Sequence, residues 1–165
     1  MNKIRKNTSG SFQEASARQR IESFLDPGSF VEICPPTERL SSPHLEHFAI
    51  PCSFDDGVII GEGELGSYNI ALAAQEGRFM GGAIGEVHSA KIVGILKRCL
   101  QKKLSAMVFL LDSGGVRLQE ANAGELGVSE IIRAILDLRA AKIPVFAVVG
   151  GSSGAFGGAS IISAC

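Results

Sequence analysis

The stretch that decides the fold runs from Met107 to Glu120 and reads MVFLLDSGGVRLQE. Its first five residues are all apolar, which predicts a strand buried on both faces. Asp112, Ser113 and two glycines then interrupt the strand, and apolar residues recur at a helical spacing from Val116 onward. We therefore predict that the pair Gly114-Gly115 lies where a buried strand ends and a helix starting at Val116 begins.

A glycine pair at such a junction has two interpretations. A helix start presents unpaired backbone N–H groups with a partial positive charge, and glycine allows a ligand oxygen to approach them closely. This arrangement can form an oxyanion site, which stabilises a thioester carbonyl as it becomes an enolate. An ordinary strand-to-helix turn, in which the glycines only permit tight packing, has the same sequence pattern.

The pattern of apolar strand, glycine pair and helix occurs three times in the chain. Its glycine pairs are Gly81-Gly82, Gly114-Gly115 and Gly150-Gly151, so the spacings are 114 − 81 = 33 and 150 − 114 = 36 residues. A repeat of this size is one supersecondary unit that buries its apolar face against the next unit. We expect the three turns to lie at one edge of the sheet and their loops to converge on one pocket.

The remaining elements follow from periodicity and turn signals. Val58–Leu65 and Tyr68–Ala74 are predicted to form an antiparallel pair, and Val145–Val149 to form a third buried strand. The predicted helices are Phe12–Leu25, Glu86–Gln101, Val116–Ala141 and a last helix from Ala159. The proline-rich segment from Cys34 to Asp56 is a predicted surface loop. Residues 1–10 are a predicted mobile tail, and residues 11–165 form one domain.

Composition limits the classes of function. The 165 residues are 45% hydrophobic and 20% charged, which is sufficient for one packed domain. The net charge of −1 argues against a nucleic-acid partner or a membrane surface. The sequence has neither a run of 18 apolar residues nor a signal-peptide pattern, so a cytoplasmic protein is expected. Its four cysteines have no C-x-x-C spacing, and we predict no metal site.

Several segments resemble acyl-CoA carboxyltransferase subunits. The shared segments are Ala17–Ile21, Phe24–Phe30, Asp56–Val58 with Gly61, Gly81-Gly82 with Gly85, Glu86, His88, Lys91 and Ile92, and Asp112–Glu120. Within that group, Ala74–Gly82 and Glu120–Gly124 are most similar to the β subunits of malonate decarboxylases. Biotin-dependent relatives more often have an Asp-Phe-Thr-like segment where this chain has Gln75–Arg78.

The resemblance covers residues 16–165 and implies a crotonase-like α/β fold, in which repeated ββα units wind into a spiral. This expectation agrees with the glycine repeat. The last helix reaches Cys165 without a helix stop signal. We therefore expect a carboxyltransferase-like domain that is incomplete at its C-terminus.

The resemblance also implies that a malonyl thioester is decarboxylated to an acetyl thioester. Loss of CO2 leaves an enolate, which backbone donors stabilise more strongly than the ground-state carbonyl. In this family the thioester is carried by a phosphopantetheine-like arm on an acyl carrier subunit, so no cofactor is expected to bind this chain directly. A γ subunit is expected to bind the carboxylate side, so the chain alone should be inactive.

The resemblance assigns residues to the site. The first pair of oxyanion donors is Gly115 and Val116, beside Gly114, and the second pair is Gly157 and Gly158. The residues expected to bind the substrate or its arm are Gly81, Gly82, Gly150, Gly151, Ser152 and Ser153.

Charged and titratable residues near these turns have competing interpretations. His88 is a candidate proton donor. Arg117 could face a phosphate or cap a surface, but a structural ion pair with Glu120 or Glu125 is the favoured expectation. Glu76 and Arg78 either fix the Gly81-Gly82 turn by a salt bridge or contact the substrate.

Two other functions remain open. The first is the carboxyltransferase subunit of a biotin-dependent acyl-CoA carboxylase, which uses the same enolate but takes CO2 from carboxybiotin. The second is a non-catalytic, truncated fragment.

Overall fold

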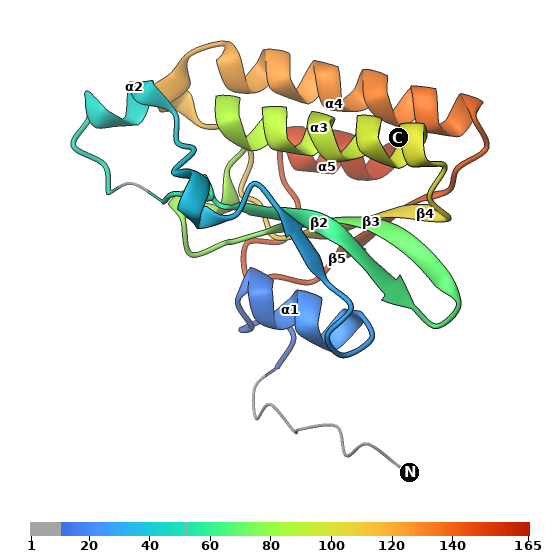
Figure 1. The fold of residues 1–165 in the computed structure, drawn as a ribbon. Helices are drawn as coiled ribbons and strands as arrows, with labels where there is room; N and C mark the ends of the chain where they lie inside the picture. Colours follow the sequence, from blue (N-terminus) through green and yellow to red (C-terminus); the bar gives the residue numbers. More distant parts are fainter. Residues whose placement is uncertain (1–10, 52) are drawn as a thin grey trace.

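The computed structural model describes residues 11–51 and 53–165, and the predicted tail of residues 1–10 lies outside the described residues. Five strands form one sheet in the order β1-β2-β3-β4-β5. They are β1 (Val31–Ile33), β2 (Val58–Leu65), β3 (Tyr68–Gln75), β4 (Ala106–Leu111) and β5 (Val145–Val149). β1, β2 and β3 pair antiparallel, whereas β3, β4 and β5 pair parallel. The sheet therefore changes type at β3 (Figure 1).

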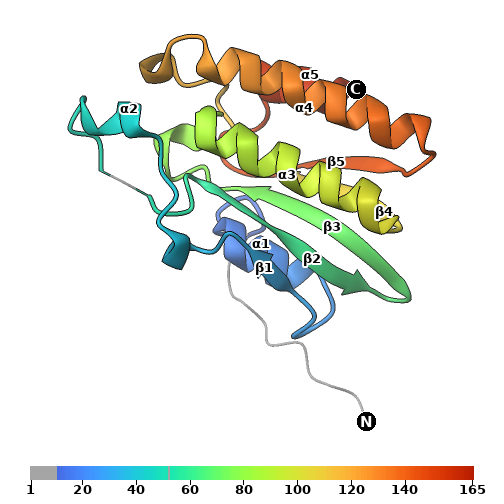
Figure 2. The same ribbon diagram turned by 45° about the horizontal axis from the view of Figure 1, so that its top comes forward.

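Helices cover the two faces of the sheet unequally. The helices are α1 (Ala17–Phe24), α2 (Pro43–Glu46), α3 (Glu86–Lys102), α4 (Ala123–Ala140) and α5 (Gly158–Ala164). Three 3-10 turns accompany them: η1 (Pro36–Glu38), η2 (Met80–Gly82) and η3 (Leu118–Glu120). The helices α3, α4 and α5 lie on one face, and α1 lies on the other (Figures 1 and 2). Within the described residues, no helix is both long enough and apolar enough to cross a bilayer.

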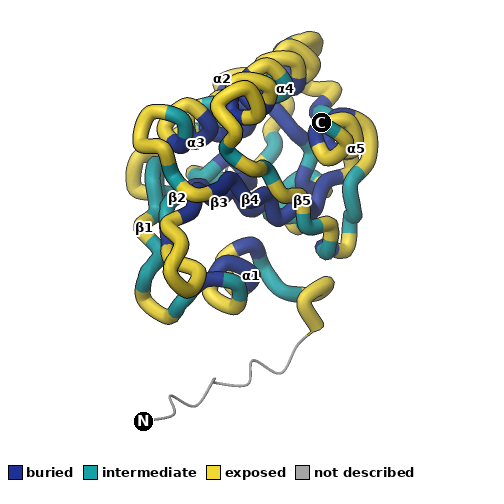
Figure 3. The backbone as a smooth tube through the Cα atoms, turned by 90° about the vertical axis from the view of Figure 1, so that its right-hand side faces the viewer, coloured by how far each residue is buried: buried dark blue, intermediate teal, exposed yellow. Residues whose placement is uncertain are grey.

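The buried centre of the molecule is the sheet itself. All six residues of β4 are buried, which is expected for a strand that is covered on both faces. One apolar cluster joins β4 to α3 and α4 through residues such as Phe109, Ile95 and Ile135. A second cluster packs Ile21 of α1 against the opposite side of the same strands. In an end-on view, buried residues concentrate along the sheet between these layers (Figure 3).

The predicted strands are confirmed in position, but the predicted burial of Val145–Val149 is wrong, because β5 is an edge strand whose residues are intermediate or exposed. Two predicted helix starts are also wrong. The β2–β3 pairing runs in register from Val58↔Gln75 to Leu65↔Tyr68. The first helix begins at Ala17 rather than Phe12, because Ser16 forms a capping box with Gln19.

The helix predicted from Val116 begins at Ala123. Val116 instead forms a single parallel β-bridge with Ile84, in which the N–H of Ile84 donates to the carbonyl of Gly115 at 2.8 Å. This pairing keeps the chain extended past the glycines and delays the helix. The predicted surface loop from Cys34 to Asp56 also contains α2 and η1.

The repeat is preserved at the turns rather than in whole ββα units. β2 and β3 form a complete hairpin before α3, but each later unit contributes one strand to the sheet. Beyond these strands, only the bridges Ile84↔Val116 and Ser113↔Ala155 pair the described residues in parallel. The bridges connect the loops that follow β3, β4 and β5, and so tie the three turns together.

Candidate functional site

The loops that follow β3, β4 and β5 are hydrogen-bonded to one another at the carboxyl end of the sheet. The N–H of Gly114 donates to the carbonyl of Gly81 at 2.8 Å. The loops after β4 and β5 are joined in the same way. The N–H of Ser113 donates to the carbonyl of Gly154 at 2.8 Å, and the N–H of Phe156 donates to the carbonyl of Ser113 at 2.9 Å. The predicted convergence of the three glycine turns at one edge is therefore confirmed.

Two of these loops place the proposed donor segments side by side. A Cβ added to Gly157 would lie 3.2 Å from the Cα of Gly115, and one added to Gly158 would lie 3.0 Å from Cγ2 of Val116. Gly115 has a φ of +135°, which favours glycine. A Cβ on Gly115 would meet no atom closer than the carbonyl oxygen of Phe156, at 3.9 Å. The space beside Gly115 is therefore open.

The candidate donors differ in whether their N–H groups already have a hydrogen-bond acceptor in the protein. The N–H of Gly114 is occupied by Gly81, and that of Gly115 donates to Oγ of Ser113 at 3.3 Å. In the part of the chain that the structure describes, the N–H groups of Val116 and Gly158 donate to no protein acceptor. The N–H of Gly157 likewise donates to no acceptor among the described residues, so the available donors are Val116, Gly157 and Gly158. Because α4 begins only at Ala123, Val116 does not gain the partial charge of a helix start.

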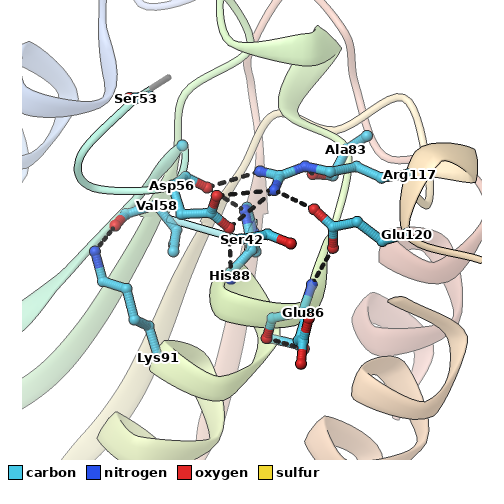
Figure 4. Close-up of polar contacts among 12 residues, drawn as sticks. Ser42, Ser53, Asp56, Val58, Ala83, Glu86, His88, Lys91, Arg117 and Glu120 are labelled. Carbon is cyan, nitrogen blue, oxygen red and sulfur yellow. Dashed lines mark hydrogen bonds and ion pairs between the residues drawn. The ribbon is translucent and has the colours of Figure 1, made fainter. Parts of the chain in front are cut away.

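A buried cluster of polar contacts around Arg117 holds the loop that follows β4 in place (Figure 4). Nη1 of Arg117 donates to both carboxylate oxygens of Asp56, at 2.9 and 3.0 Å, and to Glu120 at 3.1 Å. Nε donates to the carbonyl of Ala83 at 3.0 Å, which ties the β4 loop to the β3 loop. Glu120 also accepts the backbone N–H of Glu86, the first residue of α3. The predicted ion pair with Glu120 is confirmed.

Asp56 is the partner that the sequence did not reveal, because 61 residues separate it from Arg117. Both side chains have an exposed fraction of 0%. Burial raises the pKa of Asp56, although Arg117 opposes this shift. Lys91 holds the same turn in place, since its Nζ donates to the carbonyls of Asp55 at 2.8 Å and Val58 at 2.6 Å. Burial lowers the pKa of Lys91.

His88 lies inside this cluster with no exposed surface. Its backbone N–H donates to Oδ2 of Asp56 at 2.7 Å, its Nδ1 lies 3.2 Å from the carbonyl oxygen of Asp56, and its Nε2 lies 3.2 Å from the amide nitrogen of Gln75. A neutral ring with its proton on Nδ1 satisfies both contacts. Burial, assisted by the charge of Arg117, lowers the pKa of His88 well below its usual value. This geometry argues against His88 as a proton donor.

A second buried ion pair lies on the α1 side. The carboxylate of Asp112 accepts Nη2 of Arg20 at 3.1 Å, the N–H of Gly77 at 3.2 Å and the N–H of Ser153 at 2.8 Å. The side chains of Arg20 and Asp112 are 0% and 4% exposed. Arg20 lies on the buried face of α1 beside Ile21, and a basic residue on an apolar helix face was the sequence signal for this pair.

Some of the residues assigned to substrate binding pack inside the fold, and others are exposed. A Cβ on Gly82 would collide with the carbonyl of Asp112, one on Gly151 would collide with the Asp112 side chain, and one on Gly150 would lie 2.6 Å from the ring of Phe12. Gly82 and Gly151 are therefore packing positions, whereas Gly150 faces only the exposed side chain of Phe12. Ser153 uses its N–H on Asp112. Gly81 and Ser152 are exposed.

Glu76 and Arg78 fix the N-terminal part of the fold rather than the Gly81-Gly82 turn. Oε2 of Glu76 accepts the N–H of Ala17 at 2.9 Å, at the start of α1. Nη2 of Arg78 donates to the carbonyl of Glu14 at 2.8 Å. Both side chains thus hold the segment that carries Arg20.

Comparisons with known proteins give a consistent result. The carboxyl transferase domain family matches residues 12–164. The malonyl-S-ACP:biotin-protein carboxyltransferase of Malonomonas rubra is 36% identical over 93% of this chain and 52% of that protein. The β subunit of acetyl-coenzyme A carboxylase carboxyl transferase from Fusobacterium nucleatum is 31% identical over 81% of this chain and 46% of that protein. The chain spans about half the length of these curated relatives.

Solved structures support the same fold. A Pseudomonas malonate decarboxylase hetero-tetramer in complex with malonate contains a chain that is 44% identical, with a TM-score of 0.86 over 93% of this chain and 56% of that one. A chain of the Pseudomonas malonate decarboxylase MdcD-MdcE hetero-dimer is 40% identical, with a TM-score of 0.75 over 96% of this chain and 62% of that one. The expected carboxyltransferase-type, crotonase-like α/β fold is confirmed.

Proposed function

Because the chain belongs to the carboxyl transferase domain family, we propose that it stabilises the enolate formed when a malonyl thioester loses CO2, as the β subunit of a malonate decarboxylase. The observation that carries this proposal is the contact between two segments with uncommitted N–H groups, Gly115–Val116 and Gly157–Gly158, beside the open space at Gly115. Two such donors are what an oxyanion hole for a thioester oxygen requires.

The proposed reaction uses these donors at the point where charge develops. The bond between the α-carbon and the carboxylate breaks, CO2 leaves, and the electron pair moves onto the thioester oxygen as an enolate. The N–H groups of Val116 and Gly158 bind that oxygen more strongly than the ground-state carbonyl, which lowers the barrier. The α-carbon then takes a proton from water and becomes the methyl group of an acetyl thioester.

Partners are proposed from the relatives and from exposed apolar side chains. The Malonomonas relative is named for a malonyl group on an acyl carrier protein, so we propose a carrier with a phosphopantetheine-like arm as the source of substrate. Leu118 is 88% exposed and Phe156 is 64% exposed, both in loops that form the site. A γ-type subunit that covers them would exclude water from the enolate.

A second candidate is carboxyl transfer to a biotin-bearing protein, which is the reaction in the name of the Malonomonas relative. The enolate is the same, but the carboxyl group is transferred to biotin instead of leaving as CO2. The segment Gln75–Arg78, which the resemblance predicts to differ from biotin-dependent relatives, does not favour either reaction. Its polar side chains contact His88, Ala17 and the carbonyl of Glu14 rather than the open space at Gly115.

Turnover in deuterated water separates these candidates. The assembled protein, with its carrier and partner subunits, is supplied with malonyl thioester in the presence and absence of avidin, which sequesters biotin. We expect deuterium in the acetyl methyl group at a rate that avidin does not change. Loss of turnover with avidin would assign the chain to biotin-dependent transfer, and no turnover under either condition would favour the non-catalytic alternative.

A further inference from the structure

One carboxylate connects all three glycine loops. Asp112 directly follows β4, and its side chain accepts N–H groups from the loop after β3 (Gly77) and from the loop after β5 (Ser153). We propose that Asp112 is a positioning residue that sets the distance between the two donor segments, Gly115–Val116 and Gly157–Gly158. This inference rests on the proposed function, because it assigns a purpose to the spacing of the same donors.

The contacts at Asp112 are close enough to transmit small shifts. Each carboxylate oxygen accepts a different loop, since Oδ2 takes Gly77 and Oδ1 takes Ser153. Side chains at Gly82 and Gly151 would collide with the backbone and side chain of Asp112, so both loops pack directly on it. The carboxylate therefore serves as a fixed spacer between the β3 and β5 loops.

Arg20 supplies the counter-charge for this spacer. Its Nη2 donates to Asp112 and to the carbonyl of Gln75, while the side-chain amide oxygen of Gln75 accepts the N–H of Asp112 at 3.2 Å. Among the described residues, Nε and Nη1 of Arg20 have no acceptor. Asp112 is thus the only carboxylate that pairs with Arg20 among these residues, and a neutral replacement would leave a buried charge without compensation.

The chain positions explain how this spacer reaches the donors. Gly115 lies three residues after Asp112, and Gly157 lies four residues after Ser153. A displacement of the carboxylate therefore moves the two donor segments relative to each other, through short lengths of backbone. A misplacement of about 1 Å at a catalytic site can reduce the rate on the order of 100-fold.

The first test replaces the spacer without changing its shape. In Asp112→Asn, the amide NH2 cannot accept an N–H, so one of the two loops loses its acceptor. In the assembled enzyme we expect kcat to fall on the order of 10- to 100-fold while KM changes by less than about 3-fold, because the remote contacts to the carrier are kept. Arg18→Met on the exposed side of α1 is the control and should leave both constants unchanged.

A double variant separates positioning from general stability. Asp112→Asn/Arg20→Met removes the unpaired buried charge, so its unfolding temperature should exceed that of Asp112→Asn alone. We expect kcat to stay low, because the two loops still lack their common acceptor. Recovery of kcat together with stability would overturn the proposal and leave a purely structural ion pair.

A milder variant tests the proposal even where Asp112→Asn does not fold. A Cβ in Gly77→Ala would collide with Oδ2 of Asp112 and push the carboxylate without changing any charge. We expect kcat to fall several-fold with KM preserved, and wild-type kcat in this variant would count against the proposal.

Hydrogen exchange gives a readout that does not depend on the reaction. In the resting protein, Asp112→Asn or Gly77→Ala should accelerate exchange together in residues 77–82, 113–116 and 151–157, and Arg18→Met should not. Acceleration confined to one loop would overturn the positioning role, whatever reaction the wild-type enzyme performs. If exchange accelerates in all three loops together but the wild-type enzyme shows no turnover, the result counts only against the proposed function.

Discussion

The glycine loops have an open side and a packed side, and the same residue type serves a different purpose on each. On the open side, a Cβ at Gly115 would meet nothing closer than 3.9 Å. On the packed side, a Cβ at Gly82 or Gly151 would collide with Asp112. Glycine on the open side leaves room for a ligand oxygen, whereas glycine on the packed side lets two backbones approach each other.

This difference refines the assignment of site residues. The resemblance grouped Gly81, Gly82, Gly150 and Gly151 as substrate-binding residues. Their surroundings show that a glycine motif combines open and packed positions within two adjacent residues. Substitutions on the packed side should therefore affect stability first, and those on the open side should affect turnover first.

The neighbours Gly81 and Gly82 provide the strongest contrast. Both have positive φ, at +63° and +68°, so alanine at either position costs about 1–2 kcal/mol. Gly82→Ala also forces a methyl group into the carbonyl of Asp112, which adds about 1–3 kcal/mol. We expect urea unfolding to show a loss of about 3 kcal/mol for Gly82→Ala and about half of that for Gly81→Ala. Equal losses would contradict the packed-side assignment.

The next expected effect is on turnover at the open side. Gly115→Val places a branched side chain in the space that the thioester oxygen would use, so kcat should fall on the order of 100-fold with little change in KM. The unfolding free energy should fall by about 1–3 kcal/mol, because a φ of +135° is sparsely populated by residues other than glycine. Gly94→Ala in the middle of α3, where a Cβ meets nothing within 4 Å, is the control with normal turnover. A rate near wild type for Gly115→Val would exclude this position from the site.

The smallest expected effect concerns His88, which is buried against Asp56. Its pKa is lowered in the folded state, so below about pH 6.5 the unfolded chain binds a proton that the folded chain excludes. Stability should therefore be lost as pH falls below 6.5, by up to about 1.4 kcal/mol per pH unit. Unfolding of His88→Gln between pH 7 and 5 should show a reduced slope, whereas the exposed His47→Gln should keep the wild-type slope. An unchanged slope in His88→Gln would mean that His88 is not held neutral.

The strands and the convergence of the turns could be predicted from local sequence. Buried parallel strands are continuous apolar runs, as in β4. Val145–Val149 was predicted with the bounds that the structure shows, but not as the exposed edge strand that it is. The start of α4 could not be predicted in this way, because residues 113–117 have helical periodicity but pair with Ile84 and Ala155 from other loops. Tertiary pairing there overrides local preference.

The sequence by itself determined the sheet, the three glycine turns and the family of the chain, because these depend on residue type and spacing along the chain. Only the tertiary structure decided which glycines face open space, and that Asp112 and Arg117 act as buried anchors on either side of the loop. The partners of these anchors, Arg20 and Asp56, lie 92 and 61 residues away. These ion pairs and His88 are buried because distant segments of the chain pack around them, and local sequence does not reveal that packing.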